Sequence, residues 1–171
     1  MRRASLAFLL LTGLPAAATI PAPREYRLKL FNTHSHERLD VVYRRDDVYD
    51  PAALAKLDLF LRDRRGGAVK PYDPKLFDLL SDLMAQVDRP GAELHVICGY
   101  RTAASNAGLR KRGSGVAKAS LHMRAEAIDI RVPGVKTSRL RDTALALARG
   151  GVGYYAGSNF VHIDTGRVRR W

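Results

Sequence analysis

The order in which strand-like and helix-like segments follow one another limits this chain more than any other feature. Residues 26–31 alternate polar and apolar side chains, and residues 40–43 repeat the pattern, which predicts a β-hairpin. Two helix-like segments come next, and strand-like segments return only at residues 93–98, 125–132 and 160–164. Because strands and helices do not alternate regularly, the pattern favours an α+β fold over a doubly wound parallel sheet.

Two Asp-Pro pairs mark where helices are expected to begin. Asp50 and Asp73 are each followed by proline, the order found when Asp caps a helix and Pro occupies its first turn. Leucines at helical spacing follow both pairs. We expect a third helix to start at Ser138, as its N-cap, and to stop before Gly150. No repeat or low-complexity linker divides residues 19–171, so one domain is expected.

Cys98 is the only cysteine, so no intramolecular disulfide can hold the fold. A chain of about 150 residues buries roughly 70% of its unfolded surface, which is enough for a core to stabilise it. Cys98 ends an apolar, strand-like run. We therefore expect a buried small hydrophobic side chain rather than a nucleophile.

The first 18 residues have the pattern of a signal peptide that is removed on export. A short basic start precedes an apolar run, Leu6 to Leu14, and then three alanines. The run is shorter than the roughly 20 residues that span a bilayer, so no stable membrane span is expected. Arg2 and Arg3 leave open a twin-arginine route beside the ordinary secretory route. The expected location is the periplasm.

The chain carries a net charge of +12. Strong positive charge attracts polyanions over long range. Nucleic acid is not expected as a partner, because an exported protein rarely meets it and the aromatic-basic alternation of single-strand binders is absent. An anionic cell-wall polymer or lipid headgroup surface fits better, and simple solubility is the plain alternative.

Two histidines and an aspartate, His122, His162 and Asp129, are the candidate metal ligands of this sequence. On a strand through residues 128–132, Asp129 points away from its apolar neighbours, and His162 does the same on the last strand. His122 lies in the approach to the first of these strands. If the strands are neighbours, three ligands meet at one point and leave a fourth position for water, as in catalytic zinc sites. The alternative is a loop histidine, a sheet histidine and a salt-bridge aspartate.

The pattern Ser120-x-His122-x6-Asp129, with Phe-Val-His162-Ile-Asp164, resembles the D-Ala-D-Ala carboxypeptidase-like zinc peptidases, the wider group of lysostaphin and the hedgehog domain. The chain is most similar to the murein endopeptidase K branch, through residues 99–102, 150–155 and 160–171. The resemblance implies one zinc ion on His122, Asp129 and His162, and hydrolysis of peptide cross-links in peptidoglycan. It also implies a small antiparallel sheet that carries the ligands, with flanking helices.

Two positions depart from the branch. Ala125 stands where a glycine is usual, and Asn159 stands where related peptidases often place a glutamate as general base. Asn159 cannot accept a proton, so the base must come from elsewhere or the metal alone must ionise the water. Asp164 is the candidate for the base or for a partner that orients a ligand. Glu126 is the second candidate, provided that the strand begins after it.

Further residues receive roles from their place beside these motifs. Arg101 is expected to stabilise negative charge on the reacting oxygen, with a structural ion pair as the alternative. Ser120 is expected to orient His122 or to touch substrate. Tyr154 and Tyr155 are expected to line the substrate groove, although a core role for one of them is equally consistent.

Four basic residues precede the site and are candidates to hold the carboxylates of wall peptides: Arg110, Lys111, Arg112 and Lys118. A solvated loop is the alternative reading of these four.

Three functions fit the sequence. The first is a zinc endopeptidase of peptidoglycan stems. The second is a D,D-carboxypeptidase with the same metal, which would need a closed, basic pocket for the free carboxylate. The third is an inactive zinc-containing module that binds the wall. We expect a monomer, with a lipoprotein as a candidate recruiting partner, and another divalent ion could replace zinc.

Overall fold

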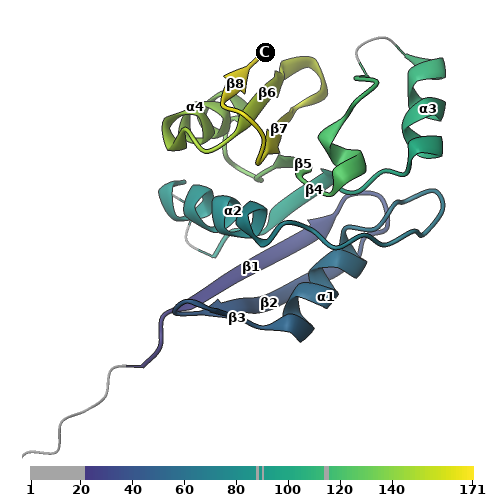
Figure 1. Cartoon of the computed structure of the whole chain (residues 1–171). Helices are drawn as coiled ribbons and strands as arrows, with labels where there is room; N and C mark the ends of the chain where they lie inside the picture. Colours follow the sequence, from purple (N-terminus) through teal and green to yellow (C-terminus); the bar gives the residue numbers. More distant parts are fainter. Residues whose placement is uncertain (1–21, 88, 90, 114–115) are drawn as a thin grey trace, which may run out of the picture.

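The computed structural model describes residues 22–87, 89, 91–113 and 116–171, so the signal peptide expected at residues 1–18 lies outside the described part. The described residues form one eight-stranded sheet in the order β3-β2-β1-β4-β5-β7-β6-β8, together with four α-helices (Figure 1). This single mixed layer with helices confirms the α+β prediction.

The predicted hairpin is confirmed. Strand β1 (Glu25–Asn32) pairs antiparallel with β2 (Arg38–Arg45), and the short β3 (Val48–Tyr49) extends the same edge.

Both Asp-Pro pairs start helices as predicted. The carboxylate of Asp50 accepts hydrogen bonds from two backbone N–H groups of the first turn of α1 (Pro51–Phe60). Asp73 caps α2 (Pro74–Gln86) through a 3.0 Å bond from the Lys75 N–H. Proline costs nothing at these first positions because its missing N–H would have had no helical partner.

The second half of the sheet is larger than the expected small antiparallel sheet. Strand β4 (Leu94–Cys98) runs parallel to β1 and antiparallel to β5 (Ala127–Arg131). Strand β7 (Phe160–Asp164) lies between β5 and β6 (Gly151–Tyr155), antiparallel to both. The short β8 (Arg169–Arg170) runs parallel to β6 at the far edge.

Helix α3 (Ala103–Arg112) begins at Thr102, and the 3-10 turn η1 (Leu121–Arg124) leads into β5. Helix α4 (Thr137–Leu147) begins one residue before Ser138, and its N-cap, Lys136, makes no side-chain capping bond, so the Ser138 cap was wrong. A second 3-10 turn, η2 (Ala156–Ser158), joins β6 to β7.

Strand β6 was not predicted, because its glycines resemble a helix stop. These glycines are required because the Asp164 and Trp171 side chains lie very close to the backbone of β6. A Cβ atom on Gly151 would lie 2.5 Å from the Asp164 carboxylate, and one on Gly153 would lie 2.6 Å from the Trp171 ring. Glycine therefore lets the Asp164 and Trp171 side chains lie directly against this strand.

One face of the central sheet is apolar and helix-covered. Helix α2 packs on β1 and α4 packs on β6 and β7, while Ile128 and Ile130 of β5 are fully buried beneath them. Asp129 alternates to the opposite face of β5. The functional side chains thus stand on a rigid sheet whose other side is anchored in the core. No helix in the described part of the chain is both long enough and apolar enough to cross a membrane.

Candidate metal centre

Two of the predicted donors face each other across neighbouring strands. Asp129 of β5 and His162 of β7 are directly paired in the antiparallel register, so both side chains leave the same face of the sheet. Cys98 of β4 is paired with Asp129 on the other side, after a bulge that follows Val96. The row Cys98–Asp129–His162 therefore crosses three strands.

His122 reaches this row from η1. Its Nε2 lies 3.2 Å from Asp129 Oδ1 and 3.1 Å from His162 Nδ1, and His162 Nδ1 lies 2.9 Å from the same Asp129 oxygen. Zinc–ligand distances of about 2.0–2.1 Å give a tetrahedral edge of about 3.3 Å. Three donors at these separations, two of them nitrogens that face each other, fit the ligation of one small cation.

The second nitrogen of each histidine is also held. His122 Nδ1 donates to the Gly99 carbonyl at 2.7 Å, and His162 Nε2 donates to Asp164 Oδ2 at 3.0 Å. These bonds fix the tautomer in which His122 Nε2 and His162 Nδ1 carry the free lone pairs. Both rings are therefore oriented toward the shared position before any cation binds.

Asp164 is fully buried and its oxygens are heavily engaged. Besides His162, the carboxylate accepts bonds from the Gly151 and Gly166 N–H groups and a two-armed contact from Arg169, at 2.7–3.0 Å. Burial alone would raise the pKa of Asp164, but these donors outweigh it and hold the pKa below its usual value. Such a carboxylate suits the orientation of His162 far better than the acceptance of a proton.

A tight turn brings His122 to the row. The Ser120 hydroxyl caps η1 by accepting from the His122 N–H at 3.3 Å, and Ala125 ends the turn in the left-handed region at φ 58°. This conformation favours glycine, which explains the residue usual at position 125 in the branch. Burial would lower the pKa of His122, but the Asp129 carboxylate beside the ring overrides this and raises the pKa above its usual value.

Arg101 borders the same position. Its Nη2 donates to the Ser120 hydroxyl at 2.9 Å, whereas its Nε is buried without a hydrogen-bond partner among the described residues. None of the ion pairs within the described residues includes Arg101, so the alternative of a structural ion pair has no support.

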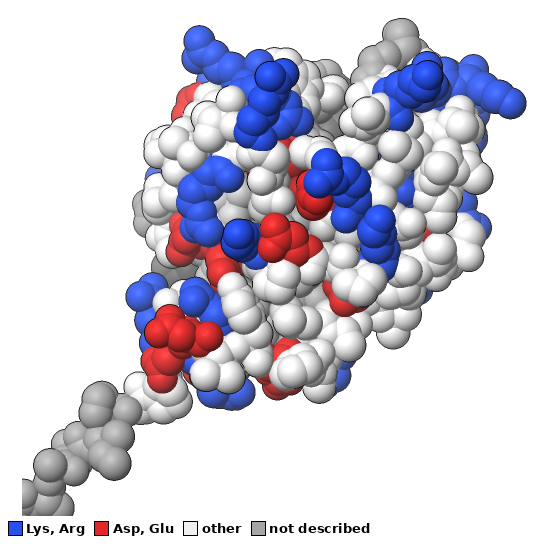
Figure 2. All heavy atoms as spheres, in the orientation of Figure 1, with Lys and Arg blue, Asp and Glu red and all other residues white. Residues whose placement is uncertain are grey.

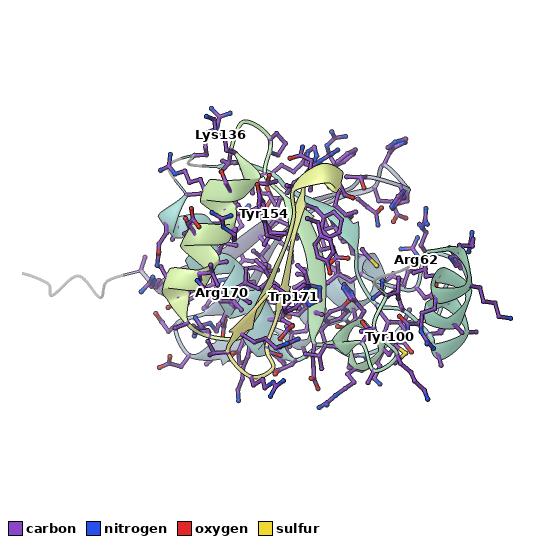
Figure 3. All side chains as sticks on the ribbon, turned by 90° about the horizontal axis from the view of Figure 1, so that it is seen from above. Arg62, Tyr100, Lys136, Tyr154, Arg170 and Trp171 are labelled. Carbon is purple, nitrogen blue, oxygen red and sulfur yellow. The ribbon has the colours of Figure 1, made fainter. Side chains whose placement is uncertain are left out.

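Two hollows, of about 230 and 280 Å³, adjoin the donor cluster and share Arg101, Asp129 and Phe160 in their walls. The second hollow has an aromatic wall in which Tyr155 stacks on Phe160 and accepts a bond from the Trp171 indole. Viewed from above, Arg62 and Tyr100 lie on the side of Trp171 toward α3 (Figure 3). All three donors line the second hollow, and Asp129 also lines the first.

Tyr154 does not line either hollow. It alternates to the other side of β6, where the Arg141 guanidinium of α4 lies 4.5 Å from its ring centre. Only Tyr155 of the predicted pair faces the groove.

Neither Asn159, at the position where related peptidases often place a glutamate, nor the second candidate base, Glu126, lines the two hollows beside the donors. Asn159 is exposed, ends η2 with φ 53° and accepts a bond from Thr137. Glu126 does precede the strand, but it pairs with Arg124 and lines a separate hollow. The left-handed turn at residue 159 accounts for asparagine there.

Sequence reasoning missed three contributors. Trp171 packs against the His162 ring at a centroid distance of 5.2 Å, and Arg169 clamps Asp164. Cys98 is half-buried rather than enclosed in the core, and donor atoms of Cys98, His122 and Asp129 all lie within 4.8 Å of one another. The strand pairing that places Cys98 beside Asp129 depends on a bulge, which no sequence pattern indicated.

A sheet-borne cluster of two histidines and a carboxylate, in which each histidine is held by a further hydrogen bond, is typical of the metal centres of metallopeptidases. The chain belongs to the peptidoglycan L,D-endopeptidase MepK family, whose sequence model matches residues 20–171. The MepK of Escherichia coli K12 is 42% identical over 157 residues, which cover 92% of this chain and 86% of that protein. A probable MepK of Haemophilus influenzae is 41% identical over 154 residues, covering 90% and 83%. The resemblance to the murein endopeptidase K branch is thus confirmed.

Proposed function

We propose that this chain is a zinc-dependent endopeptidase that hydrolyses an L,D peptide bond in peptidoglycan cross-links. The observation that carries the proposal is that the three donors, His122, Asp129 and His162, line one hollow, which shares Asp129, Arg101 and Phe160 with a second hollow beside it. A substrate chain can then extend to both sides of the bond that is cut. The relatives named peptidoglycan L,D-endopeptidases support the choice of bond and polymer.

A zinc ion on the three donors would lower the pKa of a coordinated water to about 7 and polarise the scissile carbonyl. Asp129 contributes a negative charge to the ligand set, and Asp164 and the Gly99 carbonyl hold the two rings in place. Arg101 lines both hollows, and among the described residues it has no carboxylate partner, which supports its role as the donor to the developing oxyanion.

Proton transfer has few candidates in this geometry. Among the described residues that line the two hollows, the carboxylates are Asp63 and Asp129. The carboxylate of Asp63 already accepts bonds from Thr102 and Ser105. We therefore assign Asp164 to the positioning of His162 and give no separate carboxylate the role of general base.

The D,D-carboxypeptidase alternative has weaker support, because it needs one closed side, whereas the hollow that the donors line shares wall residues with a second hollow. Export to the periplasm after loss of residues 1–18 accords with a peptidoglycan substrate. Recruitment by a lipoprotein and a monomeric state stay predictions.

Digestion of purified peptidoglycan by residues 19–171, with mass spectrometry of the released muropeptides, tests the proposal. Loss of cross-linked dimers that a chelator abolishes and zinc restores is the expected result. Intact dimers with shortened stems would instead identify a carboxypeptidase. Unchanged peptidoglycan in the presence of one bound zinc per chain would leave a wall-binding module.

Two histidine variants make the metal assignment testable. His122→Ala should lose both bound zinc and cleavage, because it removes one of three ligands. His36→Ala changes an exposed histidine on the β1–β2 turn and serves as the matched control. Full zinc content and activity in His122→Ala would refute the ligand set.

A further inference from the structure

The first of the two hollows is strongly basic. Its wall contains Arg62, Arg64 and Arg65 from the segment after α1, and Arg101 at the border of the donors. Arg62 pairs with Glu37 at 2.9 Å, but the ion pairs found among the described residues include neither Arg64 nor Arg65. Within the described part of the chain, the guanidinium groups of Arg64, Arg65 and Arg101 thus lack a carboxylate partner beside the reacting position.

The carboxylates in this wall do not neutralise the arginines. Asp63 is 2% exposed, and its carboxylate accepts five hydrogen bonds, from Thr102, Ser105 and two backbone N–H groups of its own loop. Asp129 is committed to the two histidines. The free charge that the hollow presents to a ligand is therefore positive.

The arginine-bearing segment, residues 61–65, is fixed rather than loosely attached. The bonds of Asp63 to Thr102 tie it to the start of α3, immediately after Arg101. The Tyr100 N–H donates to the Leu61 carbonyl at 2.8 Å, and a Cβ atom on Gly99 would lie 2.5 Å from that oxygen. Backbone packing this close sets the distance between the arginines and the donor cluster.

The second hollow has a different chemical character. Besides the three donors, Arg101 and Arg169, its wall contains Tyr155, Phe160 and Trp171 together with small residues of the segment before η1. The residues that line only one hollow thus differ, with the arginines of the 61–65 segment in the first and Tyr155 and Trp171 in the second, and this difference would give a peptide bound across both a preferred direction.

We propose that the basic hollow is a subsite for a carboxylate-bearing residue of the substrate peptide, bound by Arg64 and Arg65 on one side of the scissile bond. This inference rests on the proposed endopeptidase function and adds the charge requirement of one subsite. Guanidinium groups hold carboxylates through paired N–H donors, so an acidic side chain or a free α-carboxylate fits this wall.

The basic residues on α3 provide a contrast. Arg110, Lys111 and Arg112 lie in its exposed last turn, and basic side chains gather at this tip of the helix (Figure 2). They do not contribute to the wall of either hollow. The structure therefore favours Arg64 and Arg65 over this group for holding wall peptides.

The test compares two substrates, a cross-linked peptide dimer with free side-chain carboxylates and the same dimer with those carboxylates amidated. The wild-type protein should cut the free acid with a kcat/KM about tenfold higher, since a charged hydrogen-bond pair discriminates by this order. Arg64→Glu/Arg65→Glu should abolish that preference by raising KM for the free acid, with kcat within about twofold. Both side chains are exposed, so the fold should be retained, as a thermal melt would verify.

Arg110→Glu/Arg112→Glu carries the same charge change at the tip of α3 and should keep the preference. Equal cleavage of both substrates by the wild-type protein would overturn the subsite while leaving the endopeptidase intact. Retained preference in Arg64→Glu/Arg65→Glu would also overturn it. Failure of the wild-type protein to cut either dimer would count against the proposed function itself.

Discussion

Replacing Asp164 by asparagine separates two roles for this buried carboxylate, the general base and the partner that orients His162. The amide has the same shape but no charge, and its NH₂ group would face His162 Nε2 if its oxygen keeps the backbone bonds from Gly151 and Gly166. A donor at that place favours the tautomer with hydrogen on Nδ1, the nitrogen that must be free for the metal.

The magnitude follows from the contacts that are lost. Loss of such a supporting partner weakens metal affinity about 10- to 100-fold. Arg169 also loses an ionic partner at 2.7 Å, and each charged hydrogen bond of this kind contributes about 1.5–3 kcal/mol. Because Arg169 stays partly exposed to water, the expected loss of unfolding free energy is about 2 kcal/mol.

Two measurements distinguish the two roles of Asp164. The first is the zinc affinity of the variant, from chelator competition, and the second is its cleavage rate over a range of zinc concentrations. A positioning role predicts weaker binding and substantial recovery of the rate once zinc saturates the variant. Asp142→Asn, which removes an exposed partner of Arg141 on α4, is the matched control and should change neither quantity. A rate that stays at least a thousandfold down at full zinc occupancy, with normal affinity, would refute the reasoning and restore Asp164 as the base.

Three further outcomes are expected. Burial would raise the pKa of Asp63, but its hydrogen bonds lower it below the unfolded value of about 3.9, so its stabilisation is complete above that pH and is lost as the pH falls from there through the lower folded-state pKa. Asp63→Asn should therefore cost about 2 kcal/mol in urea unfolding at pH 7 and less at pH 3, and an equal loss at both would contradict this. Gly153→Ala places a methyl group 2.6 Å from the Trp171 ring, so kcat/KM should fall while zinc content, measured by a colorimetric chelator, stays at one per chain; unchanged kinetics would remove Trp171 from the groove. Ala148→Gly relieves a left-handed residue at φ 51° and should raise the melting temperature by about 2 °C, whereas Ala146→Gly in the helix should lower it.

Sequence patterns predicted the elements whose signals are local. The Asp-Pro starts of α1 and α2, the β1–β2 hairpin and β7 follow from side chains within a few residues, and all are present. Strand β6 was missed because its glycines are required by close contacts with Asp164 and Trp171, which lie well beyond it in the sequence. Local patterns hold no information on such contacts.

Asp129 and His162 were predictable because strand alternation fixes which face each side chain takes, whereas His122, which lies in the turn η1, was found by its spacing before the strand. The structure brings the three together, while their role as metal ligands stays a proposal. Their supporting partners were harder to foresee. The Gly99 carbonyl carries no side-chain signature, and the contact of Arg169 with Asp164 depends on the turn between β7 and β8.

The strand order has a consequence for biosynthesis. His122 and His162 are 40 residues apart in the chain, and β7 must insert between β5 and β6 before they meet. A ribosome-bound chain that has not yet reached residue 164 therefore holds no complete donor set. The donor set is thus completed only near the end of synthesis, and a chain cut short before β7 would keep His122 and Asp129 without their third partner.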